Sequence, residues 1–437
     1  MQGLSEELPL STERVVLFLG EEELPGVAEL TFVWAPFPHT KARITTGQLD
    51  PKIEWVAHTR ETAEFELILY GTKTRALLMS FNSRLEGQSV RLALDAALPE
   101  FEHGDGPFTR VQFSIANFRR FFGTWIKTGD HAGRAGRLTF RHDGWVVVVE
   151  NAPNLDDLQE SRKRLIGHAI THNGYFQRED DKPFRVLDAD RILSALLGLL
   201  CLAHGAWAPY IMPVGLDSSG VKVWERWYIP KGDPWTSPSN WFDWTHPDGL
   251  DQMFGHILNG CANDDWKRAF ENALFWYDQI ARNSAPNATL LLAQTGLEIL
   301  SWYRFVTAGS EPAATFDKKP AAYRIRRLLQ EYSIPVGIPE ELGALSNLAF
   351  SEGWSDGPHA TTALRNLDVH PKGNSAPFEV VNEASTLTLW HFELCLLAFA
   401  GYGGVYRNRT QWPRSDSLEY VPWVVGPSAS EAFVEST

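Results

Sequence analysis

The apolar residues of this 437-residue chain change their spacing partway along it, and this change constrains the fold more than any other feature. Before about residue 185, β-branched and aromatic residues form short runs that turn residues separate. Beyond about residue 250, apolar residues recur every three or four positions, as on one face of a helix. The sequence therefore predicts an α+β multidomain protein, with a β-rich part first and a helical part after it.

The first part contains several short runs typical of strands, at residues 14–19, 29–34, 65–70, 90–94 and 111–115. Two further runs, 138–141 and 145–150, flank His142-Asp143-Gly144. Asp-Gly between two such runs is a strong signal for a tight hairpin. We expect residues 1–185 to form an antiparallel β-rich domain, either a sandwich or a barrel.

The chain changes character over residues 186–246. An aspartate at about position 188 can cap a helix, a β-run follows at 221–229, and residues 230–246 are rich in Pro, Ser and Trp, as linkers often are. Residues 247–437 then show helical spacing, with helices expected to begin near residues 264, 286, 323 and 339, and a last one at 382–399. This part predicts an all-α bundle.

Composition limits the functional classes. The net charge is −14 and the pI about 5.4, which argues against a protein that coats nucleic acid through a broad basic surface. The three cysteines suggest neither a disulfide framework nor a metal site. His168 and His172 lie four residues apart but have no apparent third ligand. We therefore expect no metal and no cofactor.

One uncharged run, residues 192–214, is about as long as a membrane span. His204, Gly205, Pro209 and Pro213 interrupt it, so a buried helix followed by an extended segment fits better. The first residues are acidic and lack the features of a signal peptide. These patterns favour a cytoplasmic protein without a membrane partner.

The best candidate for chemistry is the stretch from Leu364 to Pro371, in which Arg365 and His370 are five positions apart. Histidine can take and give a proton near neutral pH, and the arginine fork suits phosphate. In a straight helix, residues five apart differ by about 140° in direction. Pro371 disfavours helical geometry at His370, which leaves the imidazole free to turn toward the arginine.

The same stretch has a plainer interpretation. Arg365 can pair with a neighbouring acid such as Asp368, while His370 merely ends a helix. An Arg-x4-His match is short and arises by chance in many chains.

The motif Ala363-Leu364-Arg365-Asn366-Leu367-Asp368-Val369-His370-Pro371 resembles the signature of the HEPN superfamily. The helix that carries Glu298 resembles the first helices of that family, and residues 401–409 resemble the tail of HEPN-like domains in bacterial antiphage proteins of the ApeA type. Those proteins also place a β-rich domain before the helical one. The resemblance implies an HEPN-like helical bundle.

It also implies a metal-independent endoribonuclease that works as a homodimer or higher homo-oligomer, needs no cofactor, and leaves a 2′,3′-cyclic phosphate and a 5′-hydroxyl. His370 would be the acid or base, Arg365 would stabilise charge on the phosphate, and Asn366 would orient one of them or bind the phosphate. Glu298 would support Arg365 or a partner, although an ordinary buried ion pair explains it as well.

Basic residues flank this region and suggest contacts with an RNA backbone. They are Lys318, Lys319, Arg324, Arg326 and Arg327, with Arg407 and Arg409 after the last helix. A solvated helix face is the alternative explanation for them.

Two hypotheses follow. In the first, the helical part cuts RNA and arrests growth in defence against phage, and the β-rich part senses or regulates, with a phage protein as a possible trigger. In the second, the bundle is non-catalytic and mediates dimerisation or partner binding, and the β-domain binds a ligand or a protein.

Overall fold

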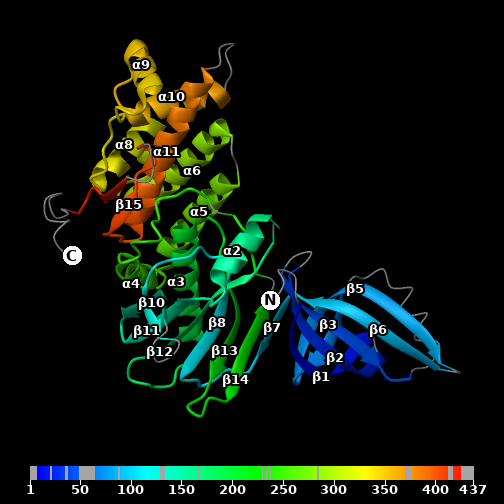
Figure 1. The fold of residues 1–437 in the computed structure, drawn as a ribbon. Coiled ribbons are helices and arrows are strands. Elements are labelled where there is room, and N and C mark those ends of the chain that lie inside the picture. Colours follow the sequence, from blue (N-terminus) through cyan, green and yellow to red (C-terminus); the bar gives the residue numbers. More distant parts are fainter. Residues whose placement is uncertain are drawn as a thin grey trace. The chain divides into compact units, whose positions relative to one another are not determined.

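A computed structural model describes most of the chain and divides it into two compact units whose sequences interleave (Figure 1). The first unit comprises Met1–Phe118, Gly144–Ala189 and Ala208–Thr236. The second comprises Arg119–Asp143, Asp190–Trp207 and Ser237–Thr437. The described residues are 7–19, 22–34, 38–48, 64–86, 89–127, 133–164, 167–228, 230–232, 234–236, 238–282, 285–369, 376–411 and 417–424.

The first unit begins with a closed antiparallel barrel of strand order β1-β2-β3-β6-β5-β4. Pairing of β1 with both β2 and β4 closes the barrel. Alternate residues point inward, as the pleat requires, and fill the interior with apolar side chains such as Leu17, Leu30, Ile44, Leu67 and Leu92. The strands are β1 (Leu8–Leu19), β2 (Glu22–Val33), β3 (His39–Thr46), β4 (Glu64–Leu69), β5 (Thr72–Glu86) and β6 (Ser89–Leu98).

Further strands of the first unit form an antiparallel sheet in the order β7-β14-β13-β8-β12-β11. Helix α2 (Leu155–Arg164) follows β11 in the chain. The strands are β7 (Glu100–His103), β8 (Arg110–Ala116), β11 (Trp145–Asn151), β12 (Ile170–Arg178), β13 (Tyr210–Leu216) and β14 (Lys222–Tyr228). Phe101 and Trp227 of this sheet belong to the same buried cluster as the barrel core, so barrel and sheet pack together.

The second unit is mainly helical. In Figure 1, α6 and α8 lie beside the long helix α11, which is apolar on nearly all sides and forms the centre of the bundle. The helices of the second unit are most of α3 (Val186–His204), then α4 (Leu250–Gly260), α5 (Asp264–Ala281), α6 (Pro286–Trp302), a π-helical turn η1 (Tyr303–Thr307), α7 (Ala313–Phe316), α8 (Ala321–Glu331), α9 (Gly343–Glu352), α10 (Gly357–Val369) and α11 (Phe378–Phe399).

Two antiparallel strand pairs also lie in the second unit. They are β9 (Thr124–Lys127) with β10 (Gly133–His142), and β15 (Val405–Arg407) with β16 (Leu418–Tyr420).

Local sequence explains where several of these helices begin. The Asn263 side chain accepts a hydrogen bond of 3.0 Å from the Trp266 amide, which caps α5, and two aspartates follow in its first turn. Proline opens α6, where its missing N–H costs nothing. Helices α5 and α6 thus begin at the residues, 264 and 286, near which helical spacing predicted them.

A buried ion pair holds the segment after α11 against the bundle. Arg409 donates two hydrogen bonds, of 2.7 and 2.6 Å, to the carboxylate of Glu393 on α11. Tyr277 of α5 donates a third, of 2.5 Å, to the same carboxylate. Burial together with that carboxylate raises the pKa of Tyr277 well above its usual value. The hydroxyl is therefore a permanent donor, and the charge on Glu393 is fully compensated.

A second buried cation explains why the units interleave. Arg119 donates to the carbonyl oxygens of His204 and Pro238, at 2.7 and 2.8 Å, and to Oδ1 of Asn240 at 2.8 Å. Burial lowers its pKa to about 10. These bonds tie the start of the 119–143 segment to the end of α3 and to the segment after Thr236. Residues far apart in sequence thus share one unit.

The expected order of a β-rich part followed by a helical part is confirmed, and the barrel is one of the two β-architectures predicted. Every predicted strand run before residue 151 matches a strand, although Trp34 and Tyr70 lie one residue beyond the ends of β2 and β4. Asp143 and Gly144 have φ angles of 49° and 73°, as a two-residue hairpin turn requires.

The two units do not follow the three consecutive domains 1–185, 186–246 and 247–437 that the sequence suggested. Their boundary near residue 236 falls inside the predicted linker. Trp241 of that segment is fully buried, and its Nε1 donates to the Leu202 carbonyl at 3.0 Å. The second half of the linker is therefore part of the bundle core.

The uncharged run at 192–214 forms most of α3 and the first half of β13. Among the described residues, no helix combines the length and the apolar character needed to cross a membrane.

The close packing of α6 on α11 generates a first prediction. A Cβ added to Gly296 of α6 would lie 2.1 Å from the Phe392 ring of α11. Gly296→Ala should therefore cost about 1–3 kcal/mol of unfolding free energy, although alanine favours the helix. Gly343→Ala in α9 is the matched control, because nothing lies within 4 Å of its added Cβ. Urea unfolding measures both, and equal stability of the two variants would contradict this packing.

A buried histidine of α11 generates a second prediction. His391 is fully buried, its Nε2 lies 3.1 Å from the Pro335 carbonyl oxygen, and burial lowers its pKa to about 4. The unfolded chain binds this proton near pH 6.5, so the contribution of His391 to stability is complete above that pH and declines toward pH 4. The loss should be on the order of 3 kcal/mol. His391→Gln should reduce this pH dependence in urea unfolding, whereas a parallel pH profile for both proteins would refute the assignment.

Candidate functional site

Arg365 and Glu298, which the sequence singled out, line one cavity of about 550 Å³ in the second unit. Four helices and the π-helical turn surround this cavity, which we call the arginine cavity. Its lining residues are Asp265, Arg268, Ala269 and Asn272 of α5, Thr295, Glu298, Ile299 and Trp302 of α6, Tyr303 and Thr307 of η1, Arg324 of α8 and Arg365 of α10.

Arg365 enters the cavity from α10 and is half-buried. Its Nη1 donates to Oδ1 of the exposed Asn366 at 3.2 Å. Its Nε is buried and has no hydrogen-bond partner among the described residues. A buried donor of this kind is costly unless something binds it. An acceptor atom of a ligand would satisfy this donor, and Asn366 contacts the same guanidinium.

Glu298 holds a different arginine. Its Oε2 accepts a 2.8 Å hydrogen bond from Nη2 of Arg324, and its Oε1 accepts from Gln294 at 3.2 Å. Nε of Arg324 is buried, like that of Arg365, and also has no partner in the described part of the chain. Glu298 thus supports Arg324, a second cation that lines the cavity, and not Arg365.

The π-helical turn contributes the aromatic wall. Tyr303 and Thr307 line the cavity from η1, directly after Trp302 of α6. Burial raises the pKa of Tyr303, and the nearby carboxylate of Asp265 adds to this effect. The tyrosine stays protonated and can donate a hydrogen bond. Insertions of π geometry in helices often accompany functional sites.

The charges of the cavity favour an anion. Three arginines line it, and two acids accompany them. Arg268 lies 3.8 Å from Asp265 in an exposed pair, which is weak, and Arg324 pairs with Glu298. Arg365 forms no ion pair with any described residue and is the cation left to bind a ligand. Bidentate binding of phosphate or carboxylate is the chemistry that suits it.

The neighbouring basic run does not form one continuous face. Nη2 of Arg326 donates to Asp356 at 2.9 Å, and Arg327 pairs with Glu311. Lys318 is exposed, and the Lys319 ammonium lies over the Tyr323 ring, 4.6 Å from its centroid. Of the five basic residues from Lys318 to Arg327, only Arg324 lines the arginine cavity. To contact Arg326 and Arg327, the phosphates of an RNA strand would have to displace the acids that pair with these two arginines.

The two arginines after the last helix have structural partners. Arg407 lies 3.0 Å from the buried Asp243, and Arg409 is buried against Glu393. Arg409 was expected to contact RNA, but its guanidinium is buried and pairs with Glu393, so it is not available for such a contact.

His370 lies outside the described residues, as does the side chain of Asp368, so neither reading of the Arg-x4-His motif is tested at these two positions. The described part of α10 reaches Val369, the residue before the histidine. His391, which belongs to the same bundle, does not line the arginine cavity.

Sequence inspection missed most of the cavity wall. Arg268 and Asn272 are four residues apart on α5, and Thr295, Glu298 and Trp302 follow helical spacing on α6. That spacing could have revealed two polar faces opposite the core. The π-helical turn has no comparable signal. Within the described residues, no group of three or more His, Cys, Asp or Glu side chains could hold a metal ion.

Two family models match the chain. The one described as the YopA central domain matches residues 103–238, and the one described as the YopA C-terminal domain matches residues 263–419. A relative in Bacillus subtilis (strain 168), the SPbeta prophage-derived uncharacterized protein YopA, is 27% identical over 358 residues, which cover 80% of each chain. No solved structure matches the chain. The arginine cavity lies within the region similar to the YopA C-terminal domain.

Proposed function

We propose that the second unit is a metal-independent endoribonuclease of the HEPN type and that the arginine cavity binds the phosphate at the cleaved bond. The observation that carries this proposal is the Arg365 guanidinium, whose buried Nε lacks a partner in the described chain. The second cation, Arg324, lines the same cavity. The resemblance of residues 363–371 to the HEPN motif supports the same reading.

The proposed reaction uses the ribose 2′-hydroxyl as nucleophile. His370 accepts its proton as the 2′-oxygen bonds to phosphorus, and the bond from phosphorus to the 5′-oxygen breaks. The leaving oxygen takes a proton from a second acid. Arg365 stabilises the negative charge that grows on the phosphate oxygens, and Asn366 keeps the guanidinium oriented. The products are a 2′,3′-cyclic phosphate and a 5′-hydroxyl.

One histidine cannot accept and donate a proton in the same step. We propose that a second copy of the chain supplies the second histidine, so that the cleaving species is a homodimer. Tyr303, which burial keeps protonated, is the alternative donor within one copy.

The setting we propose is defence against phage in the cytoplasm, with RNA cleavage causing growth arrest. The first unit would then sense a trigger, such as a phage protein, and restrain or release the nuclease. The order of a β-rich part before a helical part, which antiphage proteins of the ApeA type share, supports this assignment.

The proposal predicts that Arg365→Ala abolishes RNA cleavage. Loss of one preorganised donor to the transition state costs about 100-fold or more in rate. The measurement is cleavage of total RNA by the purified full chain in EDTA, with the ends of the products mapped. His370→Ala should be equally inactive.

Lys267→Ala is the control for this experiment, since Lys267 forms an exposed pair with Glu271 and does not line the cavity. It should cleave like the unaltered protein. Full activity of Arg365→Ala, or activity that EDTA removes, would refute the mechanism.

The dimer makes a separate prediction. Specific activity should fall when the protein is diluted, in step with the dimer fraction that light scattering measures at the same concentrations. Undiminished specific activity in a monomeric sample would exclude a site composed of two copies. It would favour Tyr303 as the second proton donor, and Tyr303→Phe would then be inactive.

A second candidate function is a non-catalytic bundle that dimerises or docks a partner, with a β-domain that binds a ligand or a protein. The ion pairs of Arg324, Arg326 and Arg327 favour it, because they neutralise the basic run that RNA would need. This function is distinguished by the absence of cleavage in both the unaltered protein and Arg365→Ala.

A further inference from the structure

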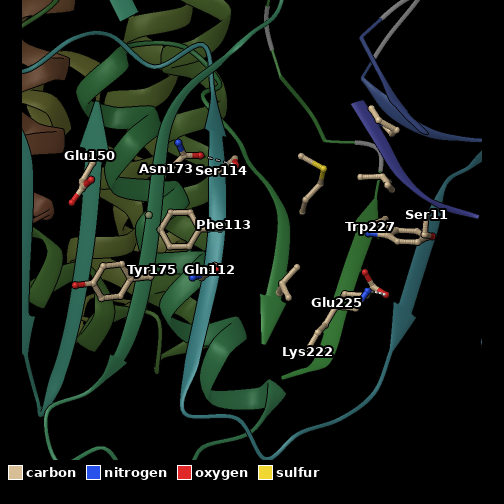
Figure 2. A pocket seen from close by; sticks show the side chains of 15 residues that line it. Ser11, Gln112, Phe113, Ser114, Glu150, Asn173, Tyr175, Lys222, Glu225 and Trp227 are labelled. Atoms are coloured by element: carbon tan, nitrogen blue, oxygen red, sulfur yellow. Dashed lines mark hydrogen bonds and ion pairs between the residues drawn. The ribbon is translucent and has the colours of Figure 1, made fainter. Parts of the chain in front are cut away.

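We propose that a cavity in the first unit binds a sugar ring through two adjacent hydroxyl groups. This goes beyond the ribonuclease proposal and does not depend on it. The cavity, of about 590 Å³, opens between strand β1 of the barrel and strands β8 and β11–β14 of the sheet (Figure 2). We call it the sheet cavity.

Irregular backbone shapes two of its walls. The register of β1 against β2 shifts between Pro9 and Ser11, and that of β13 against β8 shifts between Ile211 and Val214. Met212, within the second bulge, has a φ of 50°, which is strained for a residue with a side chain. Both irregularities line the cavity. Bulges and strained residues of this kind re-aim side chains and concentrate at binding sites.

A buried carboxylate supplies the anchor. Glu225 on β14 is 4% exposed, and Nζ of Lys222 donates to its Oε1 at 2.9 Å. No other hydrogen bond to this carboxylate comes from the described residues. The Lys222 side chain is 46% exposed, so it can turn toward water when a ligand arrives. A carboxylate with a free oxygen accepts hydrogen bonds from neighbouring ring hydroxyls, as acids that bind ribose do.

Neutral polar groups face the anchor. Figure 2 shows Gln112, Ser114 and Asn173 on β8 and β12, across the cavity from Glu225 on β14. Ser114 donates to Oδ1 of Asn173 at 3.0 Å, which leaves the amide NH₂ of Asn173 to donate to a ligand. Gln112 is exposed and offers both a donor and an acceptor. Paired amides suit a ligand that has several hydroxyl groups.

The charges select an uncharged sugar. Among the described lining residues, Glu150 and Glu225 are acids, and the one cation, Lys222, is paired with Glu225. A phosphate would meet net repulsion here. The shared feature of the expected ligands is therefore an adjacent pair of hydroxyls on a neutral ring. It occurs in free sugars and in the ribose of nucleosides.

Titration of the full-length protein, followed by ligand-observed NMR, tests the proposal. The probes are adenosine, uridine, D-ribose and D-glucose, with 2′,3′-dideoxyadenosine and adenosine 5′-monophosphate as comparisons. We expect at least one of the four diol probes to bind at millimolar concentration or below. When adenosine binds, 2′,3′-dideoxyadenosine should bind at least about tenfold more weakly, because it loses a hydrogen bond to a charged group. Adenosine 5′-monophosphate should also bind at least about tenfold more weakly, because its phosphate is repelled by the acids of the wall. Binding of nucleosides alone identifies a nucleoside site, and binding of ribose or glucose identifies a sugar site.

Glu225→Gln should weaken binding of the same probe about tenfold or more, since it removes the charged acceptor. Glu100→Gln is the matched control, because Glu100 is an exposed acid on the neighbouring strand β7 and does not line the cavity. Gln112→Ala, at an exposed position, serves as a second variant if Glu225→Gln unfolds. Failure of all four diol probes to bind, or equal binding by Glu225→Gln or by dideoxyadenosine, would overturn the proposal.

Discussion

The buried charge of Glu393 is the constraint on which the helical unit depends. A carboxylate in the middle of an apolar helix is tolerated only when it is paired and fully hydrogen-bonded, and Arg409 and Tyr277 meet both needs. Because Arg409 follows the last helix, the pair pulls the chain back across the bundle, where its Nη2 also donates to the Ser239 carbonyl at 3.0 Å. One charge on α11 thereby fixes α5, the segment after α11 and the segment before α4.

That arrangement also sets the walls of the arginine cavity. Helix α6 packs against α11 through Gly296 and Phe392, and two residues later it presents Glu298 to the cavity. Helix α5 is held by Tyr277 and presents Arg268 and Asn272 from its earlier turns. The polar lining groups are thus positioned by helices that the buried core holds in place. Polar groups mounted on rigid helices lose little entropy when a ligand binds.

Local signals predicted the elements well and their grouping poorly. The Asp143-Gly144 turn and the helical spacing of apolar residues after positions 264 and 286 each act within a few residues, so strands and helix starts could be predicted directly. Arg409 was assigned to RNA because its neighbours in sequence are basic, whereas its partner Glu393 lies sixteen residues away. Arg119 joins segments more than eighty residues apart. Pairing at such distances depends on the tertiary fold, which sequence spacing does not contain.

The two cavities have opposite electrostatic character, and this separates their ligands. The arginine cavity has three cations against two acids, and the buried Nε atoms of Arg324 and Arg365 lack acceptors among the described residues. The sheet cavity has two acids against one cation, and that cation is already paired. A phosphate gains at the first and is repelled at the second, whereas a neutral sugar gains little at the first. In a chain of net charge −14, any phosphate recognition must be local, and within the described structure we propose the arginine cavity as its place.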